Sequence, residues 1–207
     1  MKPILSILTP SIPRHKLLTD TLLAELYQQK LSLQSTHPSL GQVQLICHDG
    51  PAFLDGGLSI GKKREQLVKE AAGKYLCFID SDDSISPNYV ETLVRLCHEH
   101  KDVVTFRNFT TTDHYWTVVD MSLEHTEDED AGPGRIVKRR PWPVCPVLSR
   151  YAKEFPFPDI NDGEDSAWMK QVLTLCKSEA HTDMILHQYR HSSKTSESMK
   201  IIKAGYV

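Results

Sequence analysis

Short apolar runs alternate with segments of helical period through the first half of the chain, and this pattern constrains the fold most. The apolar runs at residues 4–8, 43–47, 75–79 and 103–106 predict buried strands. Between them, residues 16–33, 62–72 and 87–100 carry the spacing or the end signals of helices. Strands that alternate with helices are typical of a parallel sheet covered by helices on both faces.

The second half of the chain is less regular. Residues 115–119 and 135–137 predict short strands, residues 124–130 an exposed acidic loop, and residues 164–176 a helix with one apolar stripe. No repeat, linker or low-complexity segment divides the 207 residues. We therefore expect one domain over residues 1–207.

Charge and composition exclude several classes of protein. Lys and Arg total 24 against 27 Asp and Glu, so the net charge of −3 gives no bulk attraction to nucleic acid or anionic membranes. No apolar run approaches the roughly 20 residues that span a bilayer. The first ten residues are too short and too soon broken by proline for a signal peptide. The 5 cysteines are widely spaced without a CxxC pair. We expect a cytoplasmic protein without a membrane span.

Three carboxylates follow the predicted strand at residues 75–79. Asp80, Asp82 and Asp83 would stand at the carboxyl edge of the sheet, where open α/β sheets bind ligands. Crowded carboxylates repel one another, and a hard cation such as Mg²⁺ or Mn²⁺ compensates for that repulsion. A solvated turn in which Asp83 or Ser84 caps the next helix is the plain alternative, and an acidic turn taken alone favours it.

A second strand also delivers a carboxylate to this edge. Asp49 ends the strand at residues 43–47 and is followed by a glycine-rich loop. Two neighbouring carboxylates suit a nucleotide, with Asp49 on a base N–H and Asp80 or Asp82 on ribose and metal. The residues after the first strand, Thr9, Pro10 and Arg14, would line the same edge.

Several motifs together resemble the family 2 glycosyltransferases of the GT-A fold, over nearly the whole chain. Residues 6–10 resemble the opening strand of that family, and residues 48–50 its DDG turn with His48 in place of the first Asp. Residues 61–64 and 72–83 resemble the stretch that ends in the DxD signature. The late pattern follows in order at residues 148–150, 155–158, 164–165 and 189–190, with Ser196 and Ser198. The departures are His48, Glu65 where asparagine is usual, and the acidic middle segment.

The resemblance implies a fold and an activity. The fold would be of GT-A type, an α/β domain with a Rossmann-like, mostly parallel sheet flanked by helices. Residues 1–110 would bind the nucleotide sugar, and residues 111–207 would hold the acceptor and the catalytic base. The implied enzyme is an inverting, metal-dependent hexosyltransferase. It would use Mn²⁺ or Mg²⁺ to move a sugar from a nucleotide-diphosphate sugar, a UDP-sugar by expectation, to an acceptor hydroxyl.

The resemblance also assigns roles to residues. Asp165 would be the general base, and Asp82 and Asp80 the metal ligands. The expected donor-binding residues are Thr9, Pro10, Arg14, Asp49, Arg64, Asp80, Asp82 and Arg190. Gly163 and a proline-rich approach place Asp165 at a helix N-terminus, whose dipole favours the ionised carboxylate that a base needs. An acidic first turn that only complements the dipole is the alternative, and the DxD context favours the base.

Other functions compete with glycosyl transfer. A phosphatase of the haloacid dehalogenase type also uses a DxD, but two strand-helix units precede Asp80 here. A nucleotidyltransferase needs a glycine-rich segment after the first strand, which residues 9–14 lack. A non-catalytic sugar-nucleotide binder would show a damaged metal or base position, and neither is damaged.

The acceptor is open at this stage. The resemblance implies a saccharide or a lipid-linked glycan, while a modified base on DNA is the alternative because the basic run at residues 138–140 could follow phosphates. Two further features have plain explanations. The Cys97–His100 segment suits a helix C-terminus better than a metal site, and His191 suits a surface position slightly better than a place at the diphosphate or the metal.

Overall fold

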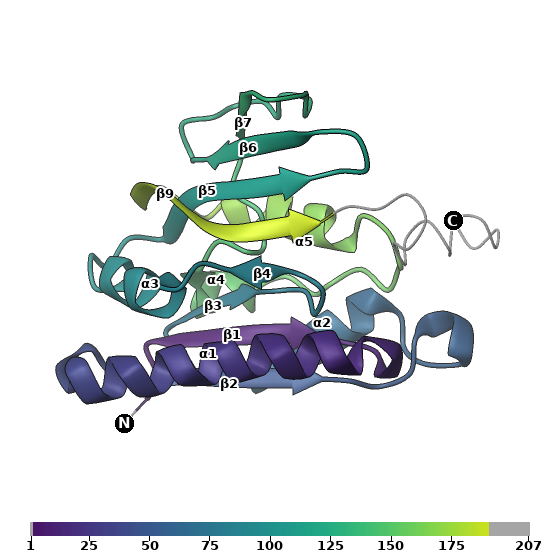
Figure 1. Ribbon diagram of the computed structural model, residues 1–207, viewed down its shortest axis with the longest axis horizontal. Helices are drawn as coiled ribbons and strands as arrows, with labels where there is room; N and C mark the ends of the chain where they lie inside the picture. Colours follow the sequence, from purple (N-terminus) through teal and green to yellow (C-terminus); the bar gives the residue numbers. More distant parts are fainter. Residues whose placement is uncertain (1, 191–207) are drawn as a thin grey trace.

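A nine-stranded sheet runs through the computed structural model, which describes residues 2–190 (Figure 1). The strands are β1 (Leu5–Pro10), β2 (Val43–His48), β3 (Tyr75–Phe78), β4 (Ser84–Ile85), β5 (Val103–Thr111), β6 (Trp116–Met121), β7 (Ile136–Arg139), β8 (Val147–Leu148) and β9 (Glu179–Arg190). The α-helices are α1 (Lys16–Thr36), α2 (Ile60–Glu70), α3 (Tyr89–Cys97), α4 (Ser149–Ala152) and α5 (Glu164–Leu173). Short 3-10 helices cover Pro13–His15, Pro38–Leu40 and Phe53–Asp55.

The strand order is β2-β1-β3-β8-β5-β6-β7, and β9 pairs with both β5 and β4. β2 and β3 pair parallel with β1, and β9 pairs parallel with β5. The short β8 is antiparallel to both β3 and β5, so β3 and β5 point the same way. β6 is antiparallel to β5, which makes the whole sheet mixed. The predicted α/β class is confirmed, and the parallel strands carry their carboxyl ends to one edge.

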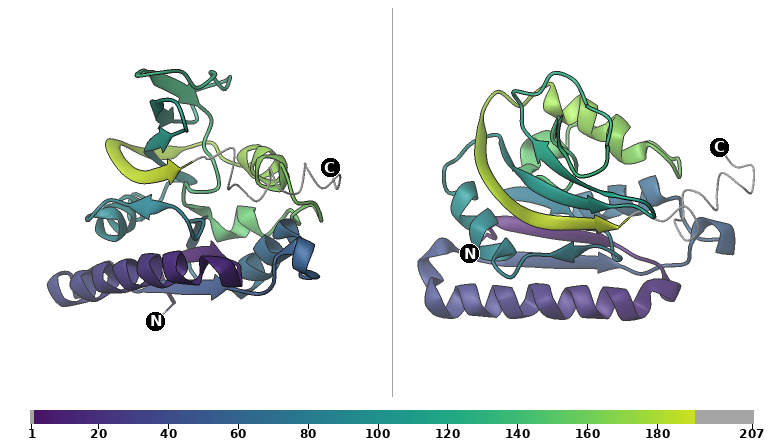
Figure 2. Two further views of the ribbon diagram at one scale, coloured as in Figure 1. Left: turned by 45° about the vertical axis from the view of Figure 1, so that its right-hand side comes forward. Right: turned by 45° about the horizontal axis from the view of Figure 1, so that its top comes forward.

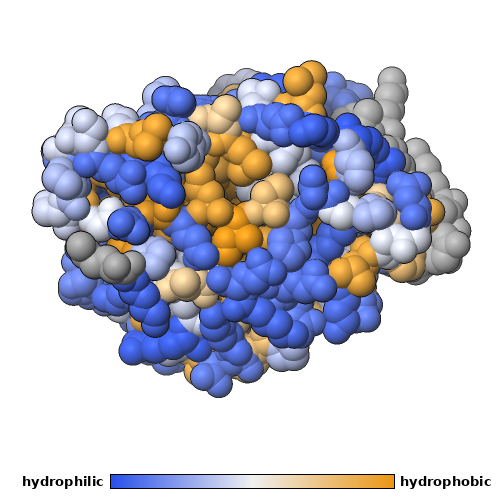
Figure 3. Space-filling view, turned by 90° about the horizontal axis from the view of Figure 1, so that it is seen from below, coloured by the Kyte–Doolittle hydropathy of each residue, from blue (hydrophilic) through white to orange (hydrophobic). Residues whose placement is uncertain are grey.

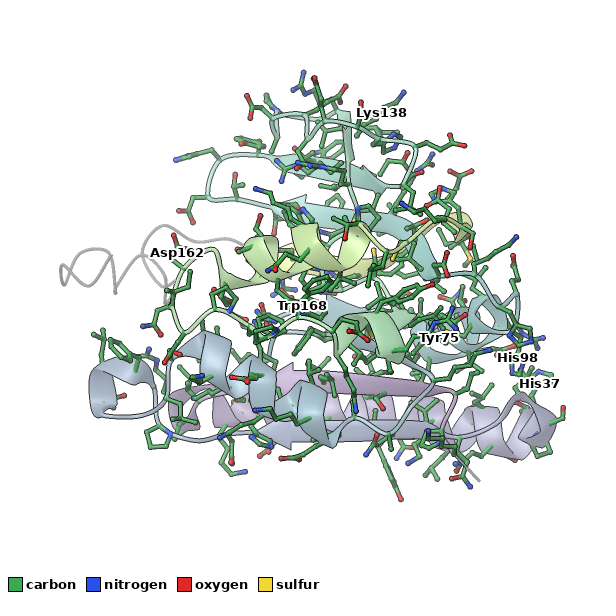
Figure 4. All side chains as sticks on the ribbon, turned by 180° about the vertical axis from the view of Figure 1, so that it is seen from behind. His37, Tyr75, His98, Lys138, Asp162 and Trp168 are labelled. Atoms are coloured by element: carbon green, nitrogen blue, oxygen red, sulfur yellow. The ribbon has the colours of Figure 1, made fainter. Side chains whose placement is uncertain are left out.

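Helices cover both faces of the sheet. α1 and α3 pack on one face, and α2, α4 and α5 lie on the other, as the views from the front and from behind show (Figures 1 and 4). β2 lies at the sheet edge beside α1, and this side of the molecule is mostly hydrophilic, with an apolar patch near its centre and smaller apolar areas around it (Figure 3). Among the described helices, none combines the length and the apolar character that a membrane crossing requires.

Three elements lie outside the sequence predictions. β4 and β8 have two residues each, and α4 has four, so none shows a readable period. β9 is a twelve-residue strand, whereas the sequence indicated only that some strand precedes Arg190. It curves across the sheet (Figure 2), and its middle is exposed, so its apolar and polar residues do not alternate. Burial on one face is what produces the alternation that reveals a strand.

An aromatic cluster fixes α5 against the end of β3. Phe157 stacks on Trp168 with ring centroids 4.4 Å apart, and Phe78 meets Trp168 edge-on at 6.0 Å. The indole N–H of Trp168 donates to the carbonyl of Phe155 at 3.1 Å, so the buried ring has a polar partner. Figure 4 shows Trp168 beneath α5 in the middle of the molecule. This packing brings the N-terminus of α5 beside the carboxyl end of β3.

The loop before α5 is also tied to the start of α2. Ser59 caps α2 by accepting from the backbone N–H of Lys62, and its hydroxyl donates to Asp159 Oδ1 at 2.5 Å. At Gly61, a Cβ atom would come within 1.8 Å of the carbonyl oxygen of Pro158. Only glycine permits so close an approach of the two backbones. These contacts set the position of the first turn of α5.

Candidate functional site

A cavity of about 250 Å³ opens where β3 ends and α5 begins. Its walls come from α2, the end of β3, the segment at 142–144, the first turn of α5, β5 and β9. Polar and charged side chains converge on it beside the aromatic rings of Phe78, Trp142 and Tyr189. The lining includes Arg64, Phe78, Asp80, Asp83, Asn108, Trp142, Glu164, Asp165, His187 and Tyr189. Such a concave site with few, convergent polar groups is typical of a ligand site.

Arg64 links two of the acidic side chains around the cavity. Its Nη2 donates to both oxygens of Asp80, at 2.9 and 3.2 Å, and its Nε donates to Glu164 Oε1 at 3.1 Å. The guanidinium also lies over the ring of Phe78, 5.0 Å from the centroid. The side chains of Arg64 and Glu164 are only 4% and 5% exposed, whereas that of Asp80 is 38% exposed. Arg64 and Glu164 are therefore buried, and Asp80 is the member of this network that contacts solvent.

Burial sets the electrostatics of this pair. Removal from water opposes the charge of Arg64, but the carboxylates of Asp80 and Glu164 outweigh that effect and raise the pKa of Arg64 above its ordinary value. Burial raises the pKa of Glu164 to about 7, while Arg64 opposes the shift. Arg64 thus stays cationic and neutralises part of the negative charge at the sheet edge.

Asp165 lies next to this network, in the first turn of α5. Its side chain is half-buried and lines the cavity, and its Oδ1 accepts from the backbone N–H of Ser166 at 2.6 Å. Gly163 is the residue before the helix and adopts φ 73°, a left-handed conformation that favours glycine. The carboxylate therefore stands at a helix N-terminus, as expected, and faces the same cavity as Asp80.

The DxD residues differ in their surroundings. Asp80 lines the cavity, whereas Asp82 is exposed and lies outside that lining. Desolvation by surrounding atoms and repulsion from Asp80 raise the pKa of Asp82, while His15 opposes the shift. His15 Nδ1 also lies 3.0 Å from Ser81 Oγ, so the segment after β1 contacts the DxD turn. Among the described residues, neither Asp80 nor Asp82 belongs to a group of three or more ligand side chains close enough to hold a metal ion, and Arg64 already binds both oxygens of Asp80, so metal binding at these carboxylates stays a prediction.

The ends of β1 and β2 form a second, more open region of the same sheet edge. Thr9 and Pro10 are buried in β1, and Thr9 Oγ1 has no hydrogen-bond partner among the described residues. Arg14 and Asp49 are exposed. None of these four lines the cavity, so their roles toward a nucleotide stay predictions.

Lys63, which sequence reasoning missed, joins the two loops of this region. Its Nζ donates to the carbonyls of Ser11 at 3.0 Å and Gly50 at 2.6 Å. Burial lowers the pKa of Lys63, and the nearby charge of Asp49 opposes that shift. A buried lysine in a polar stretch of helix does not show in the apolar spacing of the sequence. Its position next to Arg64 was the one sign that it lies near the site.

β9 brings the remaining predicted residues toward the site. Tyr189 lines the cavity, and Arg190 is the exposed last residue of the strand. The predictions for His191, Ser196 and Ser198 lie outside the described residues.

A buried polar chain, also missed in the sequence, forms one wall of the cavity. His187 Nε2 lies 2.9 Å from Asp83 Oδ2, and His187 Nδ1 lies 3.2 Å from Asn108 Oδ1. Asn108 Nδ2 in turn donates to Thr110 Oγ1 at 3.1 Å. The two residues lie on strands that pair with each other, but Arg107 precedes Asn108 and Gln188 follows His187, so no apolar stretch marks them in the sequence.

A second acidic group lies on β6 and β9. Asp120, His181 and Asp183 bring ligand atoms close enough to hold a metal ion. Arg107, however, already pairs with Asp120 at 3.0 Å and with Asp183 at 2.5 Å. A guanidinium between the carboxylates supplies the positive charge that a metal would bring, so this group is explained as an ion-pair network.

The histidines at the end of α3 lie far from the cavity. His98 and His37 lie at the end of the molecule opposite Asp162, which leads into α5 (Figure 4). His98 Nε2 lies 2.8 Å from the carbonyl of Leu40, as expected for a histidine with a structural role. The Cys97–His100 segment is therefore remote from the cavity.

The basic run at residues 138–140 is paired with the acidic loop. Arg140 donates to Asp128 Oδ2 at 2.7 Å, and its backbone N–H donates to Asp128 Oδ1. The backbone N–H of Lys138 donates to Glu129, and Arg139 Nε donates to the Glu129 carbonyl. Asp128 thus offsets the charge of Arg140, while the contacts of Lys138 and Arg139 with Glu129 each involve a backbone group, so the choice of acceptor stays a prediction.

Comparison with protein families agrees with the motifs. The model described as Glycosyl transferase family 2 matches residues 54–149, a little under half of the chain. This segment holds α2, β3 and the DxD turn. No curated protein sequence matches the chain significantly. The resemblance read from the motifs is confirmed.

Solved structures of TarS from S. aureus share the fold. The structure of TarS 1-349 aligns with a TM-score of 0.59 at 14% identity and covers 92% of this chain and 60% of that one. The structure of its complex with UDP aligns with a TM-score of 0.61 at 16% identity and covers 94% of this chain and 62% of that one. The structure of its complex with UDP-GlcNAc aligns with a TM-score of 0.61 at 14% identity and covers 97% of this chain and 61% of that one. This chain thus spans about three fifths of those structures, and at such identity they show the fold alone.

Proposed function

We propose that this chain, a family 2-like glycosyltransferase with the GT-A fold, inverts the anomeric centre as it moves a sugar from a UDP-sugar to an acceptor hydroxyl. The observation that carries the proposal is the cavity in which Asp80, Arg64 and Asp165 meet. The cavity lies at the edge of the sheet that binds ligands in open α/β folds. Among the described residues, the carboxylate of Asp165 makes no ion pair with a basic side chain and accepts from the backbone N–H of Ser166. The solved complexes of TarS with UDP and UDP-GlcNAc support the choice of donor.

The donor would extend along the carboxyl edge of the sheet. We place the nucleoside over the ends of β1 and β2, with Asp49 on the base and Thr9, Pro10 and Arg14 beside it. The diphosphate would approach Asp80, Asp82 and Arg190. Arg64 does not face the donor alone, because its guanidinium is fixed between Asp80 and Glu164. We therefore assign Arg64 a positioning role.

Asp165 would act as the general base. The acceptor hydroxyl gives its proton to Asp165 while its oxygen attacks the anomeric carbon and the bond from that carbon to the diphosphate oxygen breaks. The N-terminus of α5 favours the ionised carboxylate before the reaction. Asp80 and Asp82 would hold Mn²⁺ or Mg²⁺, which neutralises charge on the departing diphosphate when bound.

The chain would function as one domain over residues 1–207. Residues 1–110 would bind the nucleotide sugar, and residues 111–207 would supply the base and the acceptor side. A saccharide or lipid-linked glycan is the proposed acceptor, since Asp128 already pairs with the charge of Arg140 in the basic run. We propose a cytoplasmic location. A screen of nucleotide sugars with Mn²⁺, read by hydrolysis and by protection against thermal unfolding, tests the function, and no response to any donor would contradict it.

Binding of UDP is expected to depend on a divalent cation. The excess of carboxylates at Asp80 and Asp82 repels a diphosphate unless a cation intervenes. Calorimetric titration of UDP with Mn²⁺ or Mg²⁺, repeated with chelator, should show tighter binding with the metal. Asp82→Ala should lose that difference while keeping the fold, because Asp82 is exposed. Equal affinities with and without chelator in the wild type would contradict the metal role.

The stereochemistry of the product is expected to be inverted. One carboxylate base suits a single in-line displacement, with no covalent sugar-enzyme intermediate. An α-linked UDP-sugar should therefore give a β-linked product. Proton NMR of early product reads the anomeric configuration from its coupling constant, before any equilibration. An α product would refute the displacement and require a retaining mechanism, even with the donor site correctly placed.

A further inference from the structure

Asp83 has an oxygen that receives no hydrogen bond from any described residue. Its side chain is 3% exposed and lines the cavity, and its Oδ1 is buried with no partner among the described residues. Buried carboxylate oxygens normally accept hydrogen bonds, and leaving one unpaired is unfavourable. An unpaired acceptor in the wall of a polar cavity indicates that a ligand group supplies the missing donor.

The neighbouring residues hold this carboxylate in one orientation. Asn108 donates through Nδ2 to Thr110, so its Oδ1 faces His187 Nδ1, which must carry a proton to make that contact. His187 Nε2 then faces Asp83 Oδ2 at 2.9 Å, and a second proton lies between these two atoms. His187 is itself 2% exposed. Oδ2 is therefore committed to His187, and only Oδ1 remains for a ligand.

The chemistry of the partner follows from this arrangement. An acceptor oxygen on a carboxylate repels a phosphate and attracts a neutral O–H or N–H group. The same cavity is lined by Asp165, the proposed base, and by the aromatic rings of Phe78 and Trp142. Rings beside a polar group suit the apolar C–H face and the hydroxyls of a sugar. The ligand group near the reacting centre is thus part of the transferred sugar, not of the nucleotide.

We propose that Asp83, positioned by His187 and Asn108, accepts a hydrogen bond from a ring hydroxyl of the donor sugar and so selects which sugar is transferred. The inference rests on the proposed function and specifies its sugar site. Asp80 and Asp82 would serve the diphosphate, whereas Asp83 faces inward. Of the three carboxylates after β3, two would therefore serve the diphosphate and the third would bind the sugar.

The test compares UDP with UDP-sugars in the wild type and in Asp83→Asn. Asparagine keeps the shape but weakens the charge-assisted hydrogen bond, so kcat/KM with the preferred UDP-sugar should fall about 10- to 100-fold. The Kd for UDP alone should change less than about twofold, because UDP does not reach Asp83. Glu91→Gln is the matched control, since Glu91 pairs with Arg95 on α3 and lies outside the cavity lining.

Monodeoxy UDP-sugars identify the hydroxyl. In the wild type, removal of one particular hydroxyl should lower kcat/KM as much as Asp83→Asn does. In Asp83→Asn, the same removal should lower kcat/KM little further. Should Asp83→Asn fail to fold, His187→Gln retains an amide donor for Asp83 and should keep the wild-type ranking of the deoxy donors. A parallel loss of UDP affinity in Asp83→Asn, or additive losses for every deoxy donor, would overturn the inference. If the wild type binds no nucleotide sugar at all, the proposed function fails before Asp83 is tested.

Discussion

Replacement of Asp165 by asparagine is expected to lower the rate of sugar transfer by about 10²–10⁴-fold, with donor binding nearly intact. Asparagine keeps the shape of the side chain and can still accept from the backbone N–H of Ser166, so the first turn of α5 should persist. It cannot take a proton from the acceptor hydroxyl. The loss should therefore appear in kcat and leave the KM for the donor close to the wild-type value.

The measurement is initial-rate kinetics with the best donor from the screen, together with the Kd for UDP by calorimetry. Glu154→Gln is a matched control, because Glu154 is exposed and outside the cavity lining. It should retain the wild-type rate. A near wild-type rate in Asp165→Asn would mean that Asp165 only complements the helix dipole and that the base lies elsewhere.

The sequence predicts the elements whose burial is regular. β1 is buried along its whole length and reads as an apolar run, and the core side of α3 carries Val90, Leu93 and Val94 at helical spacing. The same regularity places Asp80 at the end of β3 and Asp165 in the first turn of α5. Both positions follow from where an element begins or ends, which is the information that periodicity supplies.

The sequence does not predict contacts between elements that are far apart along the chain. Arg64 meets Glu164, which is 100 positions later, and Asp83 meets His187, which is 104 positions later. No local pattern records such a pair, because it arises only when β3, α2, α5 and β9 pack around one cavity. The resemblance alone assigns Arg64 to the donor. The structure shows Arg64 bonded to two carboxylates in the lining of the cavity, and its role toward a donor stays a prediction.

Replacement of Arg64 by methionine is expected to destabilise the fold by about 3–5 kcal/mol, the typical cost of removing one partner from a buried ion pair. Methionine approximates the length of the side chain but leaves Glu164 buried without a cation. Asp80 adds less to the loss, since it is 38% exposed and water screens its charge. Denaturant unfolding followed by circular dichroism measures the change in the free energy of unfolding.

Two further variants separate the charge from the packing. In Arg64→Met with Glu164→Gln, no buried carboxylate remains unpaired, so part of the lost stability should return although the ion pair is gone. Arg95→Met removes an exposed partner of Glu91 and should cost under about 1 kcal/mol. If Arg64→Met is no more destabilising than Arg95→Met, the buried pair does not hold the site together. The double variant should regain stability but not sugar transfer. In that case Arg64 and Glu164 act by placing Asp80 and Asp165 on either side of the cavity, as their geometry indicates.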